Sequence, residues 1–313
     1  MESFQTNDGA TIKYIDVGLT TPDDARPKKG TVIMIHGFTG SSEVWKRNVP
    51  ALASEYNLII PDLRGHGSSS KPKHGYHVSR LAMDLHELIL HLRARHGDKI
   101  MPLSAIGGSL GCSILWCFSE LFGTSPFQHM IFIDQSPLQN STLDGWDSRF
   151  CNRGMNSAPA VAALQTTLAF SPVTAHRGTI AACLAYRSHP LPTDDVSTAT
   201  AQEDEAFFLG EAMKGDSAWY GKLMADHTAL DWRDSIRATL GPASGSETKV
   251  LVVASSRSGC FPSEGPMKVV DLVNGGEKLG KAKGLVVNWG GHWCYWEKPE
   301  LFNQIVLDFL KSS

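Results

Sequence analysis

The stretch Gly107-Gly108-Ser109-Leu110-Gly111 has the pattern G-x-S-x-G and decides the fold of this chain. An apolar run at 100–106 precedes it, and a run typical of a helix at 112–118 follows it. In the order strand, tight turn, helix, this pattern is typical of a nucleophile elbow, which exposes a serine hydroxyl at the end of a strand. Glycines suit such a turn because it is strained and crowded. The N-terminus of the following helix would stabilise negative charge near the serine.

Apolar and amphipathic runs alternate along the rest of the chain. Further strands are predicted at 31–35, 57–60, 129–133, 249–254 and 284–288, with an alternating edge strand at 11–16. Helices are predicted at 42–53, 78–95 and 302–310. Nearly continuous apolar strands separated by helices predict an α/β fold with a mostly parallel, doubly wound sheet that is covered on both faces.

The pattern changes between residues 137 and 245. This segment has no clear strand, is rich in Ala, Thr, Ser and aromatic residues, and contains predicted helices at 160–170 and 202–213. Both of its ends are tied to the predicted sheet, which favours an insertion over a separate domain. We therefore expect a core of residues 1–136 and 246–313 and a helical cap insertion of residues 137–245 over the active site.

Composition limits the classes of function. The chain has 313 residues, of which 42% are hydrophobic and 19% charged, as in ordinary globular proteins. A net charge of -3 gives no electrostatic reason to expect nucleic acid or an anionic membrane as a partner. The six cysteines lack metal-like spacing, and the N-terminus lacks a signal pattern. We expect reduced thiols in a cytoplasmic protein with no membrane segment; the oligomeric state is left open.

A serine nucleophile needs a base within hydrogen-bond reach and an acid that orients this base. His292 is the best candidate for the base, because it follows the last predicted strand and so shares an edge of the sheet with Ser109. The adjacent Gly290 and Gly291 allow its loop to approach closely. The other histidines have no comparable context.

Four motifs occur in order and at ordinary spacing. They are Ile-His-Gly-Phe at 35–38, Pro-Asp-Leu-Arg-Gly-His-Gly-Ser at 61–68, the elbow at 107–111 and Gly-His-Trp at 291–293. Together they resemble the α/β-hydrolase superfamily, specifically its capped esterase, C–C hydrolase and haloperoxidase-like group. The resemblance covers nearly the whole chain except the cap.

The resemblance implies Ser109 as nucleophile and His292 as base. It also implies an oxyanion hole formed by the backbone N–H groups of Phe38 and Leu110. No metal or organic cofactor is implied. Superfamily members that hydrolyse epoxides or remove halogens carry Asp at the elbow, so a serine there argues against these reactions.

The acid is the point at which this sequence departs from the family pattern. The usual acid follows the strand before the last one, in G-x-x-D-x-x-x-P, and Ser258 stands in its place here. Asp134 ends the preceding core strand, a position at which some superfamily members carry the acid. We therefore expect the triad Ser109, Asp134 and His292. A strand-end capping role for Asp134, or a serine–histidine dyad, remains an alternative.

These residues predict a serine hydrolase that cleaves an ester, a lactone or a related carbonyl compound through an acyl-enzyme. We expect apolar residues of the cap to bind an apolar or aromatic small-molecule substrate, although each could instead belong to the cap core; they are Trp146, Phe150, Trp219 and Tyr220, with Met155, Phe207, Phe208 and Met224. The alternatives are a cofactor-free C–C bond hydrolase or lyase, and a small-molecule receptor with vestigial hydrolysis. The missing usual acid is what keeps the receptor alternative open.

Overall fold

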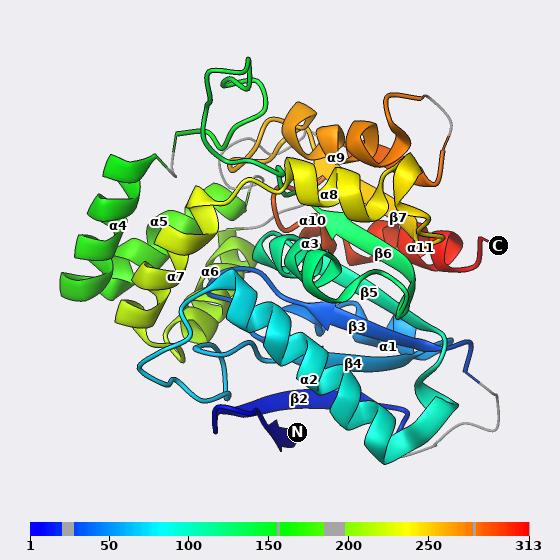
Figure 1. Ribbon diagram of the computed structural model, residues 1–313. Coiled ribbons are helices and arrows are strands. Elements are labelled where there is room, and N and C mark those ends of the chain that lie inside the picture. The colour runs from blue at the N-terminus through cyan, green and yellow to red at the C-terminus, as the bar shows by residue number, and fades with distance from the viewer. Residues whose placement is uncertain (21–27, 155–156, 185–197, 278–279, 313) are drawn as a thin grey trace.

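The computed structural model describes residues 1–20, 28–154, 157–184, 198–277 and 280–312 (Figure 1). The strands of this part are β1 Glu2–Gln5, β2 Thr11–Val17, β3 Thr31–Ile35, β4 Asn57–Pro61, β5 Leu103–Gly108, β6 Phe127–Ile133, β7 Lys249–Ser255 and β8 Ala282–Val287. The helices are α1 Val49–Ala53, α2 Val78–His96, α3 Leu110–Phe122, α4 Ala158–Phe170, α5 Pro172–Cys183, α6 Thr198–Ala212, α7 Ser217–Ala229, α8 Arg233–Leu240, α9 Glu264–Asn274, α10 Cys294–Glu297 and α11 Pro299–Leu310.

The strands form one sheet in the order β1-β2-β4-β3-β5-β6-β7-β8. β1 and β2 pair antiparallel, as do β2 and β4, and all pairs from β4 to β8 are parallel, which confirms the mostly parallel α/β fold. The prediction of β2 as the edge strand is wrong, because β1 pairs with its outer side. β1 has four residues and only Phe4 is buried, so its alternation is too short to recognise in the sequence.

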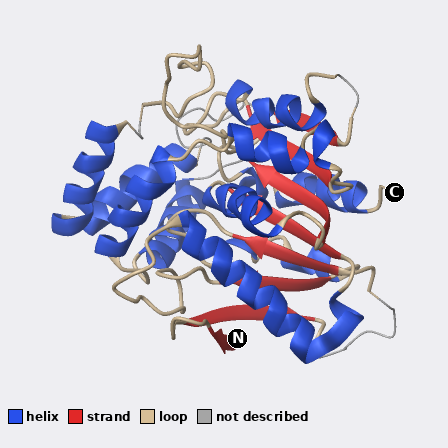
Figure 2. Cartoon of the chain, viewed as in Figure 1, coloured by secondary structure: helices blue, strands red, loops and turns tan. Residues whose placement is uncertain are grey.

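Helices cover both faces of the sheet (Figure 2). Successive side chains of a strand point to opposite faces. Thus Ile33 and Ile35 of β3 pack into a core with α2, α3, α8 and α9, whereas Val32 and Met34 pack into a second core with α10 and α11. Because β3 is buried on both sides, its sequence is apolar throughout.

The segment between β6 and β7 contains α4 to α8, and they fall into two groups. α4 packs against α5 and α7, and α5 packs against α6, so these four helices gather beside one end of the sheet (Figure 1). α8 instead packs against α3 and α9, and its Ile236 and Leu240 join the core under that helix layer. The predicted insertion at 137–245 therefore includes one helix that covers the sheet itself.

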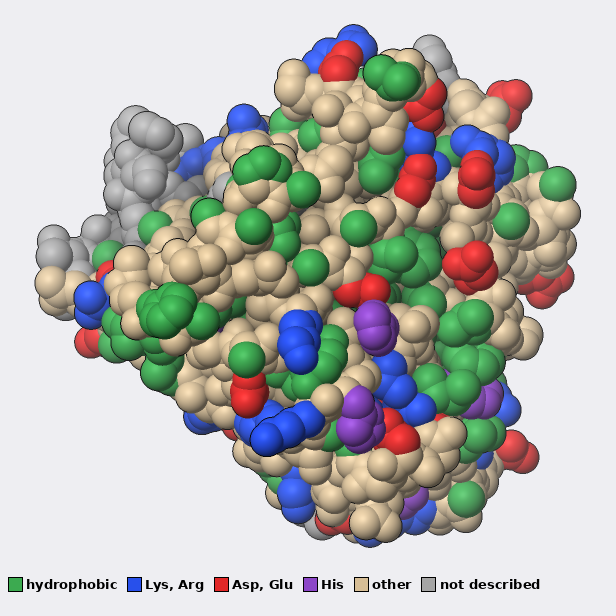
Figure 3. Space-filling model, turned by 60° about the vertical axis from the view of Figure 1, so that its left-hand side comes forward, with side chains coloured by type: hydrophobic (Ala, Val, Ile, Leu, Met, Phe, Trp, Pro, Cys, Tyr) green, Lys and Arg blue, Asp and Glu red, His purple; other side chains and the backbone are tan. Residues whose placement is uncertain are grey.

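The described helices include none that is long and apolar enough to cross a membrane. On the face shown in Figure 3, side chains of both charges are interspersed among apolar ones. All six cysteines lie within the described residues and none of them forms a disulfide.

Candidate active site

The turn between β5 and α3 has the strained geometry that the sequence predicts. Ser109 adopts a φ of 52° and a ψ of -117°, a backbone conformation that residues with a side chain rarely adopt. A Cβ atom at Gly107 would lie 2.6 Å from the carbonyl group of Gly111, and one at Gly111 would lie 2.5 Å from the carbonyl oxygen of Ile35. Because these neighbours are backbone atoms, only glycine fits at either position.

The two loops after β6 and β8 bring Asp134 and His292 together. Nδ1 of His292 lies 2.7 Å from Oδ2 of Asp134, and both side chains are buried. Oδ1 of Asp134 accepts a hydrogen bond of 3.0 Å from the backbone N–H of Ser255. Asp134 also has a positive φ, of 49°. A carboxylate beside Nδ1 holds the proton on that nitrogen and leaves Nε2 as the basic atom.

Ser258, which stands where the family acid is expected, contacts the acid instead. Its hydroxyl donates a hydrogen bond of 2.6 Å to Oδ2 of Asp134. The same hydroxyl accepts hydrogen bonds from the backbone N–H groups of Cys260 at 3.1 Å and Phe261 at 3.2 Å. The loop after β7 therefore holds the carboxylate that β6 supplies.

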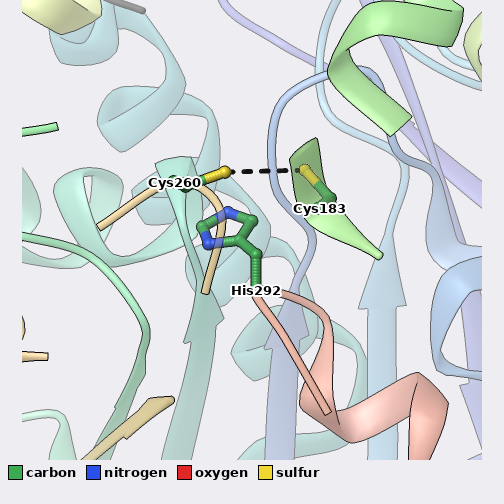
Figure 4. A group of neighbouring side chains, drawn as sticks. All are labelled: Cys183, Cys260 and His292. Carbon is green, nitrogen blue, oxygen red and sulfur yellow. Dashed lines mark hydrogen bonds between the residues drawn. The ribbon is translucent and has the colours of Figure 1, made fainter. Parts of the chain in front are cut away.

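Two thiols lie beside the imidazole of His292. The sulfur atoms of Cys183 and Cys260 are 3.8 Å apart (Figure 4). Burial alone lowers the pKa of His292, but Cys260 and Asp134 together outweigh burial and raise it above the ordinary histidine value. The hydrogen bond with Cys183, together with the nearby imidazole, lowers the pKa of Cys260, although burial opposes this shift. The sequence gives no sign of this thiol pair, because its members are 77 residues apart.

Ser109 and His292 both line a cavity of about 340 Å³. One wall consists of residues from α4, α5 and α7, and the loops at the ends of the core strands form the other. The residues that line the cavity include Phe38, Gln135, Gln139, Met224, His227, Phe261 and Trp293. The helices inserted between β6 and β7 thus contribute to the same cavity as the predicted nucleophile and base.

The backbone N–H groups expected to form the oxyanion hole lie next to the elbow. Leu110 is the first residue of α3, so its N–H is one of those that a helix leaves without an intrahelical partner. A Cβ atom at Gly37 would lie 3.1 Å from Cβ of Ser109, so the loop that carries Phe38 runs directly against the elbow. His36 fixes this loop, because its Nε2 accepts the N–H of Leu63 at 3.0 Å.

Gln135, Gln139 and His227 are polar cavity residues that were not predicted from the sequence. The hydroxyl of Ser109 donates a hydrogen bond of 3.3 Å to the side-chain oxygen of Gln135. Nε2 of His227 accepts one of 3.0 Å from the side-chain amide of Gln139, and burial lowers the pKa of His227 to about 4, so this imidazole is neutral at pH 7. The position of Gln135, directly after the candidate acid, was the one available signal. His227 lies in a helix that the sequence did not predict.

None of the four aromatic residues predicted to bind substrate lines this cavity, although all four are described. Trp219 packs against His66, and Tyr220 packs against the ring of Phe38 from outside the cavity. Both belong to the core shared with α2 and α3. This corrects the expectation, and the physical reason is that their apolar surface is used for packing between the cap helices and the core.

Trp146 and Phe150 pack on each other in a small separate cluster. Of the other residues considered, Met224 lines the cavity. Phe208 stacks on Trp293, which also lines the cavity. Phe207 stacks on a tryptophan of α10, and Met155 lies outside the described residues. Residue type alone therefore did not separate cavity residues from packing residues.

Comparison with known families agrees with the fold. The family model described as the alpha/beta hydrolase fold matches residues 30–299. The chain belongs to this family. The resemblance seen in the sequence motifs is thus confirmed, and family membership supports hydrolase activity without specifying the bond that is cleaved.

This α/β hydrolase is similar over short stretches to two proteins that are named as enzymes. It is 36% identical to a soluble epoxide hydrolase from Corynebacterium sp. over 111 residues, which are 36% of this chain and 34% of that protein. It is 34% identical to a fluoroacetate dehalogenase from Burkholderia sp over 88 residues, 26% of this chain and 29% of that protein. The aligned stretches thus span about a third of the length of these relatives.

Solved structures match over the whole chain at low identity. An esterase from Exiguobacterium antarcticum superposes with a TM-score of 0.78 at 18% identity and covers 99% of both chains. An enol-lactonase from Burkholderia xenovorans LB400 superposes with a TM-score of 0.76 at 14% identity and covers 99% of this chain and 100% of that one. At these identities the likeness shows the fold alone.

Proposed function

We propose that this α/β hydrolase is a serine hydrolase that cleaves an ester, a lactone or a related carbonyl compound through an acyl-enzyme on Ser109. His292 acts as the base and Asp134 as the acid. The observation that carries the proposal is that Ser109, in its strained elbow, opens into the same cavity as His292, whose Nδ1 is held 2.7 Å from Asp134.

In the proposed reaction, Nε2 of His292 takes the proton of the Ser109 hydroxyl, and the serine oxygen attacks the carbonyl carbon. The N–H groups of Phe38 and Leu110 stabilise the resulting oxyanion. The imidazolium then gives its proton to the leaving oxygen, which departs as an alcohol or stays tethered in an opened lactone. A water activated by His292 hydrolyses the ester on Ser109. Asp134 stabilises the imidazolium throughout.

A serine at the elbow favours carbonyl substrates over epoxides and alkyl halides. Attack of Ser109 on an alkyl carbon would form an ether, which water does not hydrolyse at neutral pH. Attack on a carbonyl carbon forms an ester, which a second acyl transfer to water removes. The names of the epoxide hydrolase and dehalogenase relatives therefore do not transfer to this chain.

The Ser109 hydroxyl donates to Gln135 in this structure, so proton transfer requires it to turn toward Nε2 of His292. Catalytic hydrogen bonds often form fully only in the presence of substrate. We propose that the substrate carbonyl, bound against the Phe38 and Leu110 N–H groups, favours this turn.

The cavity indicates the kind of substrate. Its volume of about 340 Å³ lies near the lower end of small-molecule sites. Phe38, Met224 and Phe261 offer apolar contacts, whereas Gln139 and His227 offer hydrogen bonds. We therefore propose a compact acyl group or lactone that combines an apolar part with a polar group.

The buried contact between Asp134 and His292 favours catalysis over a receptor with vestigial hydrolysis. The receptor alternative depended on the absence of an acid from its usual place. With Asp134 beside Nδ1, the base has the partner that an efficient triad needs.

Intact mass after treatment with a fluorophosphonate probe tests the proposal. We expect rapid single labelling of the wild type and of Ser113→Ala, a matched control in which a buried serine one turn further along α3 is changed. Ser109→Ala and His292→Ala should lose rapid labelling. Labelling of Ser109→Ala at the wild-type rate would overturn the proposal.

A further inference from the structure

Cys183, Cys260 and His292 form a cluster of metal-ligating side chains in the wall of the cavity (Figure 4). One ligand atom from each lies within 4.8 Å of the other two, and all three residues are buried. They come from the end of α5, the loop after β7 and the loop after β8. Since three elements supply the ligands, the cysteine spacing in the sequence could not reveal the cluster.

We propose that these three residues bind a Zn²⁺ ion and that the bound ion blocks the base of the enzyme. The blocking effect rests on the proposed function of His292, whereas the binding site does not. The carrying observation is the distance of 3.8 Å between the sulfur atoms of Cys183 and Cys260. Two thiolates on one tetrahedral zinc, each about 2.3 Å from the metal, lie about 3.8 Å apart.

The imidazole has the orientation that a zinc ligand needs. Nδ1 is occupied by Asp134 at 2.7 Å, and Figure 4 shows the ring nitrogen farther from the main chain turned toward the two sulfurs. A zinc-bound histidine usually donates its other ring N–H to a carboxylate in this way. A sulfur and a nitrogen on tetrahedral zinc lie about 3.6 Å apart, so closing the cluster requires movements of about 1 Å.

The donor set suits zinc better than hard cations. Two thiolates and one imidazole favour Zn²⁺ or another soft ion over Mg²⁺ or Ca²⁺, which prefer oxygen ligands. Binding displaces one proton from each thiol to the solvent, without a change in oxidation state. The lone pair of Nε2 then binds the metal, so it cannot accept the proton of Ser109. All three residues line the cavity.

A disulfide between Cys183 and Cys260 is the competing fate of this pair. It would require an oxidant and would bring the sulfurs to about 2 Å from each other. The zinc site leaves their present separation unchanged, and the third ligand, His292, has a ring nitrogen within 4.8 Å of both sulfurs. The geometry therefore favours the metal.

Equilibrium dialysis with Zn²⁺, in a phosphine reductant that keeps the thiols reduced, tests binding without reference to activity. We expect one tightly bound ion per chain, and affinity at least about 100-fold lower in Cys183→Ser and in Cys260→Ser. Cys117→Ser, which changes a buried cysteine of α3 outside the cavity, should bind as the wild type does. In the wild type, Co²⁺ should give the charge-transfer and visible absorption bands of tetrahedral thiolate ligation. Cys183→Ser and Cys260→Ser should not give these bands.

Stoichiometric Zn²⁺ should also inhibit hydrolysis by the wild type, and a chelator should restore it. Equal zinc binding by the wild type and both ligand variants, with the variants folded by circular dichroism, would overturn the site. Binding without inhibition would overturn the blocking effect if Ser109→Ala abolishes hydrolysis. If Ser109→Ala retains hydrolysis, the proposed function fails and the zinc site stands on the dialysis result.

Discussion

We expect Asp134→Asn to lower kcat/KM by about four orders of magnitude while the fold stays intact. This loss corresponds to about 5.5 kcal/mol of transition-state stabilisation, since each tenfold change is about 1.4 kcal/mol. The substitution keeps the shape of the side chain and replaces one oxygen with an NH₂ group. Asp134 has three hydrogen-bonding neighbours, which are the Ser255 N–H, the Ser258 hydroxyl and Nδ1 of His292. The effect depends on which of them faces the new NH₂ group.

The surroundings of Asp134 decide this orientation. Oδ1 accepts the backbone N–H of Ser255, a donor that cannot reverse its role. Oδ2 faces the Ser258 hydroxyl and the His292 imidazole, and both of these can act as acceptors. The amide of asparagine should thus place its NH₂ group toward His292. This forces the proton of the imidazole onto Nε2, so the ring cannot take the proton of Ser109.

Hydrolysis of an activated acetate ester, together with the rate of fluorophosphonate labelling, measures the effect. Ser258→Ala is the matched control, because it removes one hydrogen bond from the carboxylate but leaves the tautomer of His292 unchanged. We expect it to lose about 10- to 100-fold, as for one hydrogen bond to a charged group of about 1.5–3 kcal/mol. The double variant Asp134→Asn with Ser258→Asp should recover part of the activity. Its new carboxylate is attached at residue 258, whose hydroxyl oxygen in the wild type lies 2.6 Å from Oδ2 of Asp134. Labelling of Asp134→Asn at the wild-type rate would refute the reasoning.

Three further outcomes are expected. Gly107→Ala should lower the free energy of unfolding in urea by at least about 3 kcal/mol, because its methyl group would meet the Gly111 backbone at 2.6 Å, and an unchanged midpoint would contradict the elbow geometry. Asp8→Asn should cost about 1–2 kcal/mol at pH 7, since its carboxylate pairs with the buried Arg64. The pairing lowers the pKa of Asp8, so its stabilisation is present above the ordinary aspartate pKa and is lost as the pH falls. Urea titrations should therefore show a smaller difference in the free energy of unfolding between the wild type and Asp8→Asn at pH 3 than at pH 7. His227→Leu should lower kcat/KM about three- to tenfold for acyl groups with a polar substituent and less for plain alkyl esters, and equal losses for both would remove His227 from substrate binding.

Much of the core and the positions of the candidate site residues could be predicted, because the evidence for them is local in the sequence. Strands such as β3 are buried on both faces, which leaves a continuous apolar run. The elbow needs glycines at fixed positions beside Ser109, and His292 needs a flexible loop after the last strand. In each case the physical requirement falls on residues that are neighbours in the chain.

The features that were missed depend on residues that only the fold brings together. Cys183 and Cys260 are separated by 77 residues, and their pairing depends on how α5 packs over the loop after β7. Trp219 and Tyr220 are as aromatic as a binding site would require, but α7 turns them into the core. An apolar side chain serves a core or a cavity equally well, so residue type could not decide between them.

The position of the proposed acid follows from the sheet rather than from a motif. β6 and β7 are parallel neighbours, with Ile133 opposite Val253, so the loops that leave them start about 4.8 Å apart at the same edge. A carboxylate from either loop can therefore reach Nδ1 of the imidazole. In this chain the carboxylate is that of Asp134, directly after β6. Ser258, in the loop after β7, has a hydroxyl that donates a hydrogen bond to Asp134. Under the proposed function, the serine and the imidazole keep the positions that the family motifs predict, whereas the acid moves by one strand within the same sheet.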